Sequence, residues 1–300
     1  MADTQEKLLV ICGPTAVGKS SLAVQIAQQY DGEVVSADSR QVYKDLDIAT
    51  GKITDEEMAG VPHHLLDVVD PQKRFSVHDY KQRADAAVGE IHDRDKLPIL
   101  CGGSGFYIQS VVDDMVFPDV PPNKKLRNKL RDRSTKSLYK ELKAKDPRRA
   151  KQIDENNPVR LIRAIEIVDE LGEVPTLEKQ QRFDTLQIGL DRPDKELKQR
   201  IIARTKERLE DGMIKEAREL QINRLSLNRM RDLGLEYEHL ADFLEDKISK
   251  QELFENVVRS DWQYAKKQRT WFQKDDRISW FHPGRESEKL LLTINDFYSD

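Results

Sequence analysis

The 300-residue chain contains only two cysteines, Cys12 and Cys101, and each closes an apolar run. So few cysteines exclude a disulfide framework and the ligand spacing of a structural zinc site, and we expect two buried thiols in a reducing compartment. The chain also lacks any run near the roughly 18 apolar residues that span a membrane. Its first residues are polar, unlike a signal peptide, so we expect a cytoplasmic protein without a membrane segment.

Charges of the two signs nearly balance over the whole chain, but they are unevenly distributed along it. The net charge is −4, whereas residues 124–151 contain thirteen Lys or Arg against three acidic residues. That segment therefore carries +10 and the remainder −14. A solvated helical face normally mixes signs, because like charges repel at helical spacing. The concentration favours contact with a polyanion such as nucleic acid over a merely solvated face.

The first functional motif is GPTAVGKS at residues 13–20. It follows an apolar run and precedes an alanine-rich helical stretch, which is the strand–loop–helix setting of the G-x-x-x-x-G-K-[ST] phosphate-binding loop. The glycines let the backbone wrap around an anion, the lysine adds positive charge, and the serine hydroxyl suits Mg²⁺. We predict phosphate or diphosphate binding by Gly13, Pro14, Thr15, Ala16, Val17, Gly18, Lys19 and Ser20, with Ser20 as a ligand of Mg²⁺.

Two further motifs follow apolar runs, SADSRQ at 36–41 and GGSGFY at 102–107. Asp38 can bind Mg²⁺ through water or accept a proton, and its alternative role is to cap the turn that follows. Gln41 offers a donor and an acceptor for a base edge. Ser104 presents a hydroxyl in a glycine-rich turn that allows close approach of a ligand. If these runs are parallel strands, the motifs meet at one edge of the sheet.

The chain as a whole predicts an α/β fold, a parallel sheet covered by helices with an inserted all-helical domain. We expect core residues 1–117, a helical nucleic-acid-binding insertion at 118–185, and completion of the core with C-terminal helices at 186–300. Strands are predicted at 7–12, 33–37, 64–67, 97–101, 187–190 and 278–281. Helices are predicted at 19–30, 76–95, 105–112, 193–221, 235–245 and 249–274, with Ser76 and Asp79 as a capping pair.

Aromatic residues alternate with basic ones on the helix predicted at 249–274. They are Trp262, Tyr264, Trp271 and Phe272, among Lys266, Lys267 and Arg269. Such a mixture suits stacking on nucleic-acid bases. Packing of the helix against the core is the commoner cause and is favoured here.

Taken together, the motifs resemble the tRNA dimethylallyltransferase (tRNA isopentenyltransferase) family. The resemblance rests on GPTAVGKS at 13–20, SADSRQ at 36–41, GGSGFY at 102–107, RLIRAIEI at 160–167 and QRTWF at 268–272. It spans nearly the full chain with the motifs in the family's order. It implies a P-loop NTPase-like core, and a reaction in which the exocyclic amine of the adenosine 3′ of the anticodon attacks dimethylallyl diphosphate and releases diphosphate.

The resemblance also assigns roles to residues. Asp38 would take the amine proton, Lys19 and Mg²⁺ would stabilise the leaving diphosphate, and Ser104 stands where threonine is usual. Arg204 matches an arginine expected at the diphosphate, with Arg231 a weaker candidate. Contacts to tRNA are implied for Asp38, Ser39, Arg40, Gln41, Ser104, Arg127, Arg160 and Arg163. Leu235 departs from the family, which usually has an aromatic residue there.

Other functions remain open from the residues alone. An ATP-dependent small-molecule kinase would share the phosphate loop and could use Asp38 as a base, but it does not explain the basic segment. Prenyl transfer to free adenine nucleotides needs no basic helical domain. A non-catalytic tRNA-binding regulator does not explain Lys19, Ser20 and Asp38 together. We expect a monomer that binds the anticodon stem-loop of tRNA and dimethylallyl diphosphate.

Overall fold

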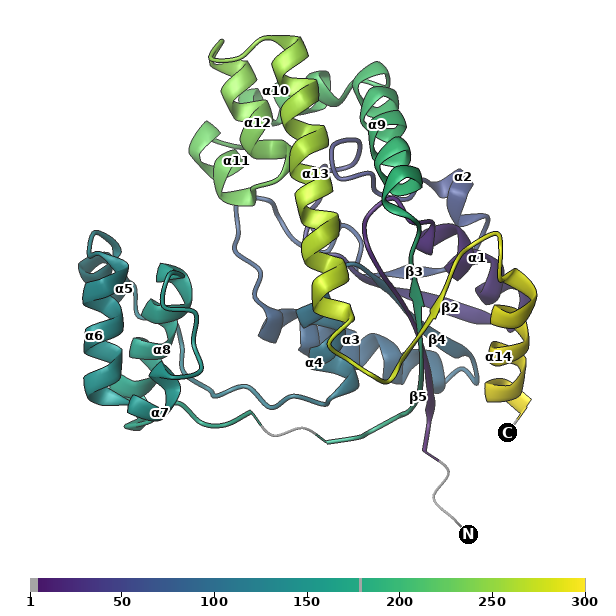
Figure 1. The fold of residues 1–300 in the computed structure, drawn as a ribbon, viewed down its shortest axis with the longest axis horizontal. Helices are drawn as coiled ribbons and strands as arrows, with labels where there is room; N and C mark the ends of the chain where they lie inside the picture. Colours follow the sequence, from purple (N-terminus) through teal and green to yellow (C-terminus); the bar gives the residue numbers. More distant parts are fainter. Residues whose placement is uncertain (1–4, 178–179, 300) are drawn as a thin grey trace. The chain divides into compact units, whose positions relative to one another are not determined.

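The computed structural model describes residues 5–177 and 180–299, which form two compact units (Figure 1). The main unit contains Met1–Asp114 and Gln181–Asp300, and the insertion contains Met115–Gln180. The insertion therefore begins three residues and ends five residues earlier than the range 118–185 that the sequence predicts. Its C-terminal boundary lies earlier because strand β5 starts at Asp184 and takes the last residues of that range into the sheet.

A six-stranded parallel sheet forms the centre of the main unit, as the sequence predicts (Figure 1). Its strands are β1 (Lys7–Cys12), β2 (Gly32–Ala37), β3 (His63–His64), β4 (Leu97–Gly102), β5 (Asp184–Leu190) and β6 (Ile278–Phe281). The order β3-β2-β4-β1-β5-β6 places β1 inside the sheet, with later strands on both sides of it. In parallel sheets, ligands bind beyond the carboxyl ends of the strands. They bind at the point in the sheet where the strands that follow are added on opposite sides.

Helices cover both faces of the sheet, and the alternation of β1 side chains separates the two cores. Leu9 and Ile11 belong to one apolar cluster with α1 (Lys19–Gln29), whereas Leu8 and Val10 belong to another with α3 (Val77–His92). The first face is also covered by α9 (Asp194–Glu210) and α14 (Ser287–Ser299), the second by α4 (Gly105–Val112), and α13 (Lys250–Phe272) contributes to both. Ser76 and Asp79 form the predicted capping box of α3.

A third cluster packs the chain around residues 42–49 against further helices. These are α10 (Met213–Asn223), α11 (Leu227–Leu233) and α12 (Glu236–Leu244). The short helix α2 (Asp55–Met58) lies between β2 and β3 in the chain and is not part of this cluster. The prediction of one helix over 193–221 was wrong, because Gly212 has φ +107° and ends α9 before α10 begins. The strand predicted at 64–67 is shorter, since Leu65 and Asp67 have positive φ.

The insertion has a separate apolar core built by four helices. They are α5 (Lys124–Arg131), α6 (Thr135–Lys145), α7 (Pro147–Ala150) and α8 (Pro158–Leu171). Each begins at an Asn, Ser or Asp whose side chain accepts a backbone N–H of the first turn. None of the described helices is long and apolar enough to cross a membrane.

Candidate active site

The three motifs meet at one edge of the sheet because their strands end in register. Gly102 at the end of β4 pairs with Cys12 of β1 on one side and with Ala37 of β2 on the other. The backbone N–H of Ser104 donates to the Ala37 carbonyl at 3.0 Å, and the Ser39 N–H donates to Ser104 Oγ at 3.0 Å. The phosphate loop, the Asp38 turn and the Ser104 turn are therefore adjacent, as expected from the sequence.

The phosphate loop needs its first glycine for both conformation and space. Gly13 has φ +138°, and a Cβ there would lie 2.3 Å from the Leu190 carbonyl oxygen. Lys19 Nζ donates to the Pro14 carbonyl at 2.8 Å, so the side chain folds back over its own loop. Burial lowers the pKa of Lys19, and the charge of Asp38 opposes that shift. Ser20 is exposed in the first turn of α1.

Three arginines from α9 and the residues before it hold this loop from outside. Arg192 Nε donates to Val17 O at 3.1 Å and Arg200 Nε to Ala16 O at 2.7 Å. Arg204 Nη2 donates to Thr15 Oγ1 at 2.6 Å. Sequence reasoning found only Arg204, although the four-residue spacing of Arg200 and Arg204 indicates a shared helix face.

Of the two arginines considered for the diphosphate, Arg204 is the one that contacts the loop. Burial lowers its pKa to about 10, and the neighbouring charge of Arg208 acts in the same direction. Arg231 is paired with carboxylates at the end of α12 instead, with Asp242 at 2.8 Å and also with Glu245. A bound diphosphate would add opposite charge beside Arg204, and the geometry therefore favours this residue as the ligand.

Asp38 is half-buried directly after β2 and caps its own turn. Its Oδ1 accepts the N–H of Arg40 at 2.8 Å and of Gln41 at 3.3 Å. Tyr264 of α13 lies close by: burial raises the pKa of its phenol to about 12, and the charge of Asp38 adds to the shift. Sequence reasoning assigned Tyr264 no place in the site, because its helix is remote in the chain.

Gln268 of the QRTWF motif joins two of the three turns. Its Oε1 accepts the Thr15 N–H of the phosphate loop at 2.8 Å, and its Nε2 donates to the Gly103 carbonyl at 2.9 Å. The side chain is buried, and a Cβ on Gly103 would lie 2.1 Å from Nε2. Gln268 thus fixes the distance between the phosphate loop and the Ser104 turn, a role that the sequence motif alone does not indicate.

The residues expected to contact RNA divide between the two units. In the main unit, Gln41 Nε2 donates to Gly51 O at 3.1 Å and Arg40 Nη1 donates to Ser39 O at 3.3 Å. In the insertion, Arg127 forms two 2.6 Å hydrogen bonds to the buried Glu166, and Arg163 lies 3.3 Å from the same carboxylate, so both arginines stabilise the fold. Arg160 is exposed.

The buried thiols are excluded as nucleophiles. Cys12 and Cys101 lie inside the sheet, as predicted, and burial raises the pKa of Cys12 to about 12 and that of Cys101 to about 11. A thiol is nucleophilic only as the thiolate, so both remain inert at neutral pH.

A buried cluster of charges supports Arg204 from behind. Arg208 lies 3.0 Å from Glu236 and 3.1 Å from Asp261, and Asp261 also lies 3.6 Å from Arg204. Burial and the neighbouring Asp261 raise the pKa of Glu236 to about 6, against the opposing charge of Arg208. The folded state therefore binds this proton more tightly than the unfolded chain does.

The raised pKa of Glu236 predicts a pH-dependent stability. Its contribution is fully present below the ordinary glutamate value of 4.5 and is lost as the pH rises through about 6. Glu236→Gln removes this titration, so the unfolding free energy of the variant relative to the unmodified protein should rise across that window. Urea unfolding at several pH values measures the difference. The exposed Glu238→Gln on the same helix is the control, and parallel curves for all three proteins would contradict the assignment.

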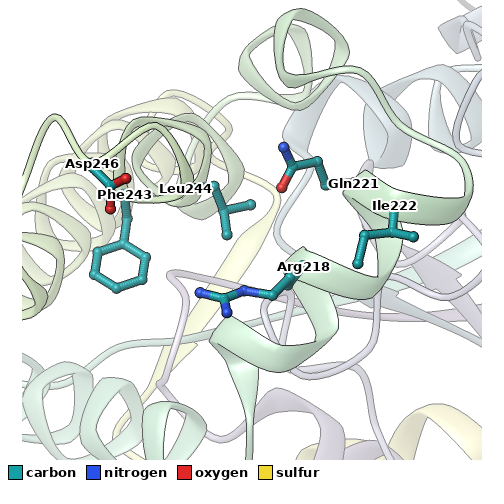
Figure 2. A pocket seen from close by; sticks show the side chains of 6 residues that line it. All are labelled: Arg218, Gln221, Ile222, Phe243, Leu244 and Asp246. Atoms are coloured by element: carbon teal, nitrogen blue, oxygen red, sulfur yellow. The ribbon is translucent and has the colours of Figure 1, made fainter.

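Two surface pockets lie away from the three turns. One, of about 350 Å³, is lined by Arg218, Gln221, Ile222, Phe243, Leu244 and Asp246. Figure 2 shows the side chains from α10 facing those at the end of α12 across this pocket. The other, of about 440 Å³, lies at the ends of β5 and β6. Neither is lined by a residue of the phosphate loop, the Asp38 turn or the Ser104 turn, so the candidate site is defined by its hydrogen bonds.

Comparison with known proteins gives one consistent family. Residues 41–275 match the family described as IPP transferase. A tRNA dimethylallyltransferase from Caldanaerobacter subterraneus subsp. tengcongensis is 39% identical, covering 92% of this chain and 91% of the relative. The tRNA dimethylallyltransferase of Carboxydothermus hydrogenoformans is 38% identical, covering 96% of each chain.

Solved structures agree in fold. The tRNA isopentenylpyrophosphate transferase from Bacillus halodurans has a TM-score of 0.73 and 35% identity, covering 98% of this chain and 96% of that one. A eukaryotic dimethylallyltransferase acting on tRNA has a TM-score of 0.86 and 28% identity, covering 98% of this chain and 80% of that one.

Proposed function

Because the chain belongs to the IPP transferase family, it modifies tRNA by prenyl transfer, and we propose that the three joined turns carry out this reaction. The exocyclic amine of the adenosine next to the anticodon attacks the allylic carbon of dimethylallyl diphosphate. A C–N bond forms, the C–O bond to diphosphate breaks, and the amine proton passes to a base. The observation that carries the proposal is the register that places the phosphate loop, Asp38 and Ser104 at one edge.

The phosphate loop takes the diphosphate of the donor. An aromatic amine is a weak nucleophile, so catalysis depends on stabilising the charge that grows on the leaving group. Lys19 would swing from the Pro14 carbonyl onto the diphosphate, and Arg204 would face it from the Thr15 side chain. Both groups are partly desolvated, which strengthens their attraction to an anion.

Mg²⁺ fits this arrangement as a partner of the donor. The described residues contain no group of three or more His, Cys, Asp or Glu side chains that could hold a metal by themselves. Mg²⁺ commonly takes one or two protein ligands and completes its shell with phosphate oxygens and water. The exposed Ser20 hydroxyl is the ligand of that kind in the loop. When bound, the ion would neutralise charge on the diphosphate.

Asp38 is the proposed base. The two backbone N–H groups that it caps both bind Oδ1, and Oδ2 is the oxygen that would receive the amine proton. The hydroxyl of Ser104 is placed beside this turn by the Ser39 N–H and can orient the incoming base. The adenine must leave its stack to reach the turn, as in other enzymes that modify bases.

The basic surface of the insertion is the proposed binding face for tRNA. Ten of the thirteen Lys and Arg between 124 and 151 are exposed. Reversing Lys124, Lys125 and Lys129 to Glu should raise the KM for tRNA and flatten its salt dependence. Each lost phosphate contact lowers the slope of log affinity against log salt concentration by roughly 0.7–0.9. Arg127 is left intact, since its loss would strand the buried Glu166.

A matched control keeps the change in net charge the same. Lys206, Lys215 and Lys247, also exposed but in the main unit, are reversed to Glu together. Initial rates at a series of salt concentrations give the slope for each protein. Equal slopes for the two triple variants would place the main tRNA surface elsewhere.

The direct test of the function is incubation with unmodified tRNA, dimethylallyl diphosphate and Mg²⁺, followed by mass analysis of the nucleosides. The expected product is an adenosine carrying a five-carbon group. Thermal shifts add a second readout, because a ligand of the native state raises the unfolding temperature. Dimethylallyl diphosphate should stabilise the protein more than ATP does. Consumption of ATP on a metabolite, without prenylated nucleoside, would refute the proposal.

A further inference from the structure

Two large aromatic side chains remain exposed beside the Ser104 turn. Phe106 is 39% exposed and Trp271 is 38% exposed, and they are two of nine large hydrophobic side chains exposed in the described part of the chain. Their ring centroids lie 6.3 Å apart at an interplanar angle of 69°. Core packing, favoured for these aromatics from the sequence, explains the buried Phe272 and the half-buried Trp262, but it does not explain Trp271.

The position of Trp271 is fixed by the backbone of the site. A Cβ on Gly105 would lie 2.2 Å from Trp271 Cδ1, so the indole lies directly against the first residue of α4. The preceding residue is Ser104, at the N-cap position of that helix, and Figure 1 shows the end of α13 beside α4. Phe106 follows Ser104 by two residues and Trp271 lies against the intervening Gly105, so both rings lie beside the Ser104 turn.

Exposed cations flank Trp271. Lys267 precedes Trp271 by four residues on the same face of α13, and Lys274 follows it by three residues just beyond the end of the helix. Both lysines are exposed. An aromatic surface between two cations is the arrangement that binds single-stranded nucleic acid, because bases stack on the rings while phosphates meet the charges.

We propose that Phe106 and Trp271 form a stacking platform for an unpaired base of the tRNA anticodon loop, with Lys267 and Lys274 on the adjoining phosphates. The inference rests on the proposed function and assigns a binding subsite within it. The adenosine that reacts leaves its stack, and the loop base beside it loses a stacking partner. The platform replaces that partner and holds the loop open at the Ser104 turn.

The test measures RNA affinity without the donor. Stacking is worth about 1–3 kcal/mol per base, so Trp271→Ala should weaken binding of an anticodon stem-loop RNA by roughly 5-fold to 150-fold. The Kd is measured with a fluorescent base, 2-aminopurine, in the loop. Trp271→Phe should restore most of the affinity, and dimethylallyl diphosphate should bind the three proteins equally. The double variant Lys267→Ala, Lys274→Ala should reduce the slope of log affinity against log salt concentration by about 1 to 2.

Controls separate this subsite from the function as a whole. Ile222→Ala, at an exposed hydrophobic residue on α10, should leave the Kd unchanged. If the unmodified protein prenylates tRNA but Trp271→Ala binds the stem-loop within twofold of it, the platform is refuted and the function stands. If the unmodified protein transfers no prenyl group to tRNA, the function itself fails. A loss of affinity that Trp271→Phe does not restore would also overturn the stacking role.

Discussion

Asp38→Asn should lower the rate of prenyl transfer by about 10²-fold to 10⁴-fold, the usual contribution of a general base. The substitution is conservative in shape, because an asparagine Oδ1 can still accept the N–H groups of Arg40 and Gln41. It removes the negative charge and the ability to take a proton. Affinity for tRNA and for the donor should therefore stay within about threefold. Single-turnover transfer with both substrates saturating measures the chemical step.

The control for Asp38 is another aspartate in the same kind of turn. Asp70 Oδ1 accepts the N–H of Gln72 at 2.8 Å, and the side chain is exposed. Asp70→Asn should transfer at the normal rate. Retention of more than a tenth of the rate by Asp38→Asn would show that Asp38 only caps its turn, the alternative that its hydrogen bonds equally permit.

Gln268→Ala should damage both stability and activity, because it leaves two backbone groups without their partner. The Thr15 N–H and the Gly103 carbonyl each lose a hydrogen bond in a buried place, at a cost of about 1–3 kcal/mol per group. The phosphate loop and the Ser104 turn would then move independently. We expect a lower unfolding free energy together with a raised KM for dimethylallyl diphosphate.

A double-mutant cycle with Gly103 tests the same contact. Gly103→Ala alone should be destabilising, since its Cβ would lie 2.1 Å from Gln268 Nε2 and would push this amide away from its two hydrogen-bond partners. In the double variant the shortened residue 268 removes this clash, so the combined loss should be smaller than the sum of the two. Gly89→Ala, where a Cβ meets nothing within 4 Å, is the control for adding a methyl group. Strictly additive losses would show that the bridge is not formed.

Much of the fold could be predicted because its signals are local. The apolar runs marked β1, β2 and β4 to within a residue, and the side chains that follow them identified Lys19, Asp38 and Ser104. Parallel strands bring their carboxyl ends together, so three separate motifs could be assigned to one site. The start of α3 could also be predicted, because Ser76 and Asp79 have the spacing of a capping box.

The remainder of the site could not be predicted because it depends on contacts remote in sequence. Gln268 meets Thr15 across 253 residues, and Arg200 meets Ala16 across 184. A glutamine or an arginine on an amphipathic helix carries no mark of the backbone group that it will bind. Arg127 shows a related limit: the basic segment suggests RNA contact, but it does not indicate that this guanidinium is paired with the buried Glu166. Its contact with tRNA stays a prediction.

The bridge made by α13 has a consequence for the timing of activity during synthesis. Lys19, Asp38 and Ser104 leave the ribosome long before Gln268, which joins the phosphate loop to the Ser104 turn. Domains begin to fold while the chain is still growing. A nascent chain that stops short of this helix would thus carry every reactive group and still lack an assembled catalytic centre. Competence should appear abruptly once α13 has been synthesised and packs onto the phosphate loop.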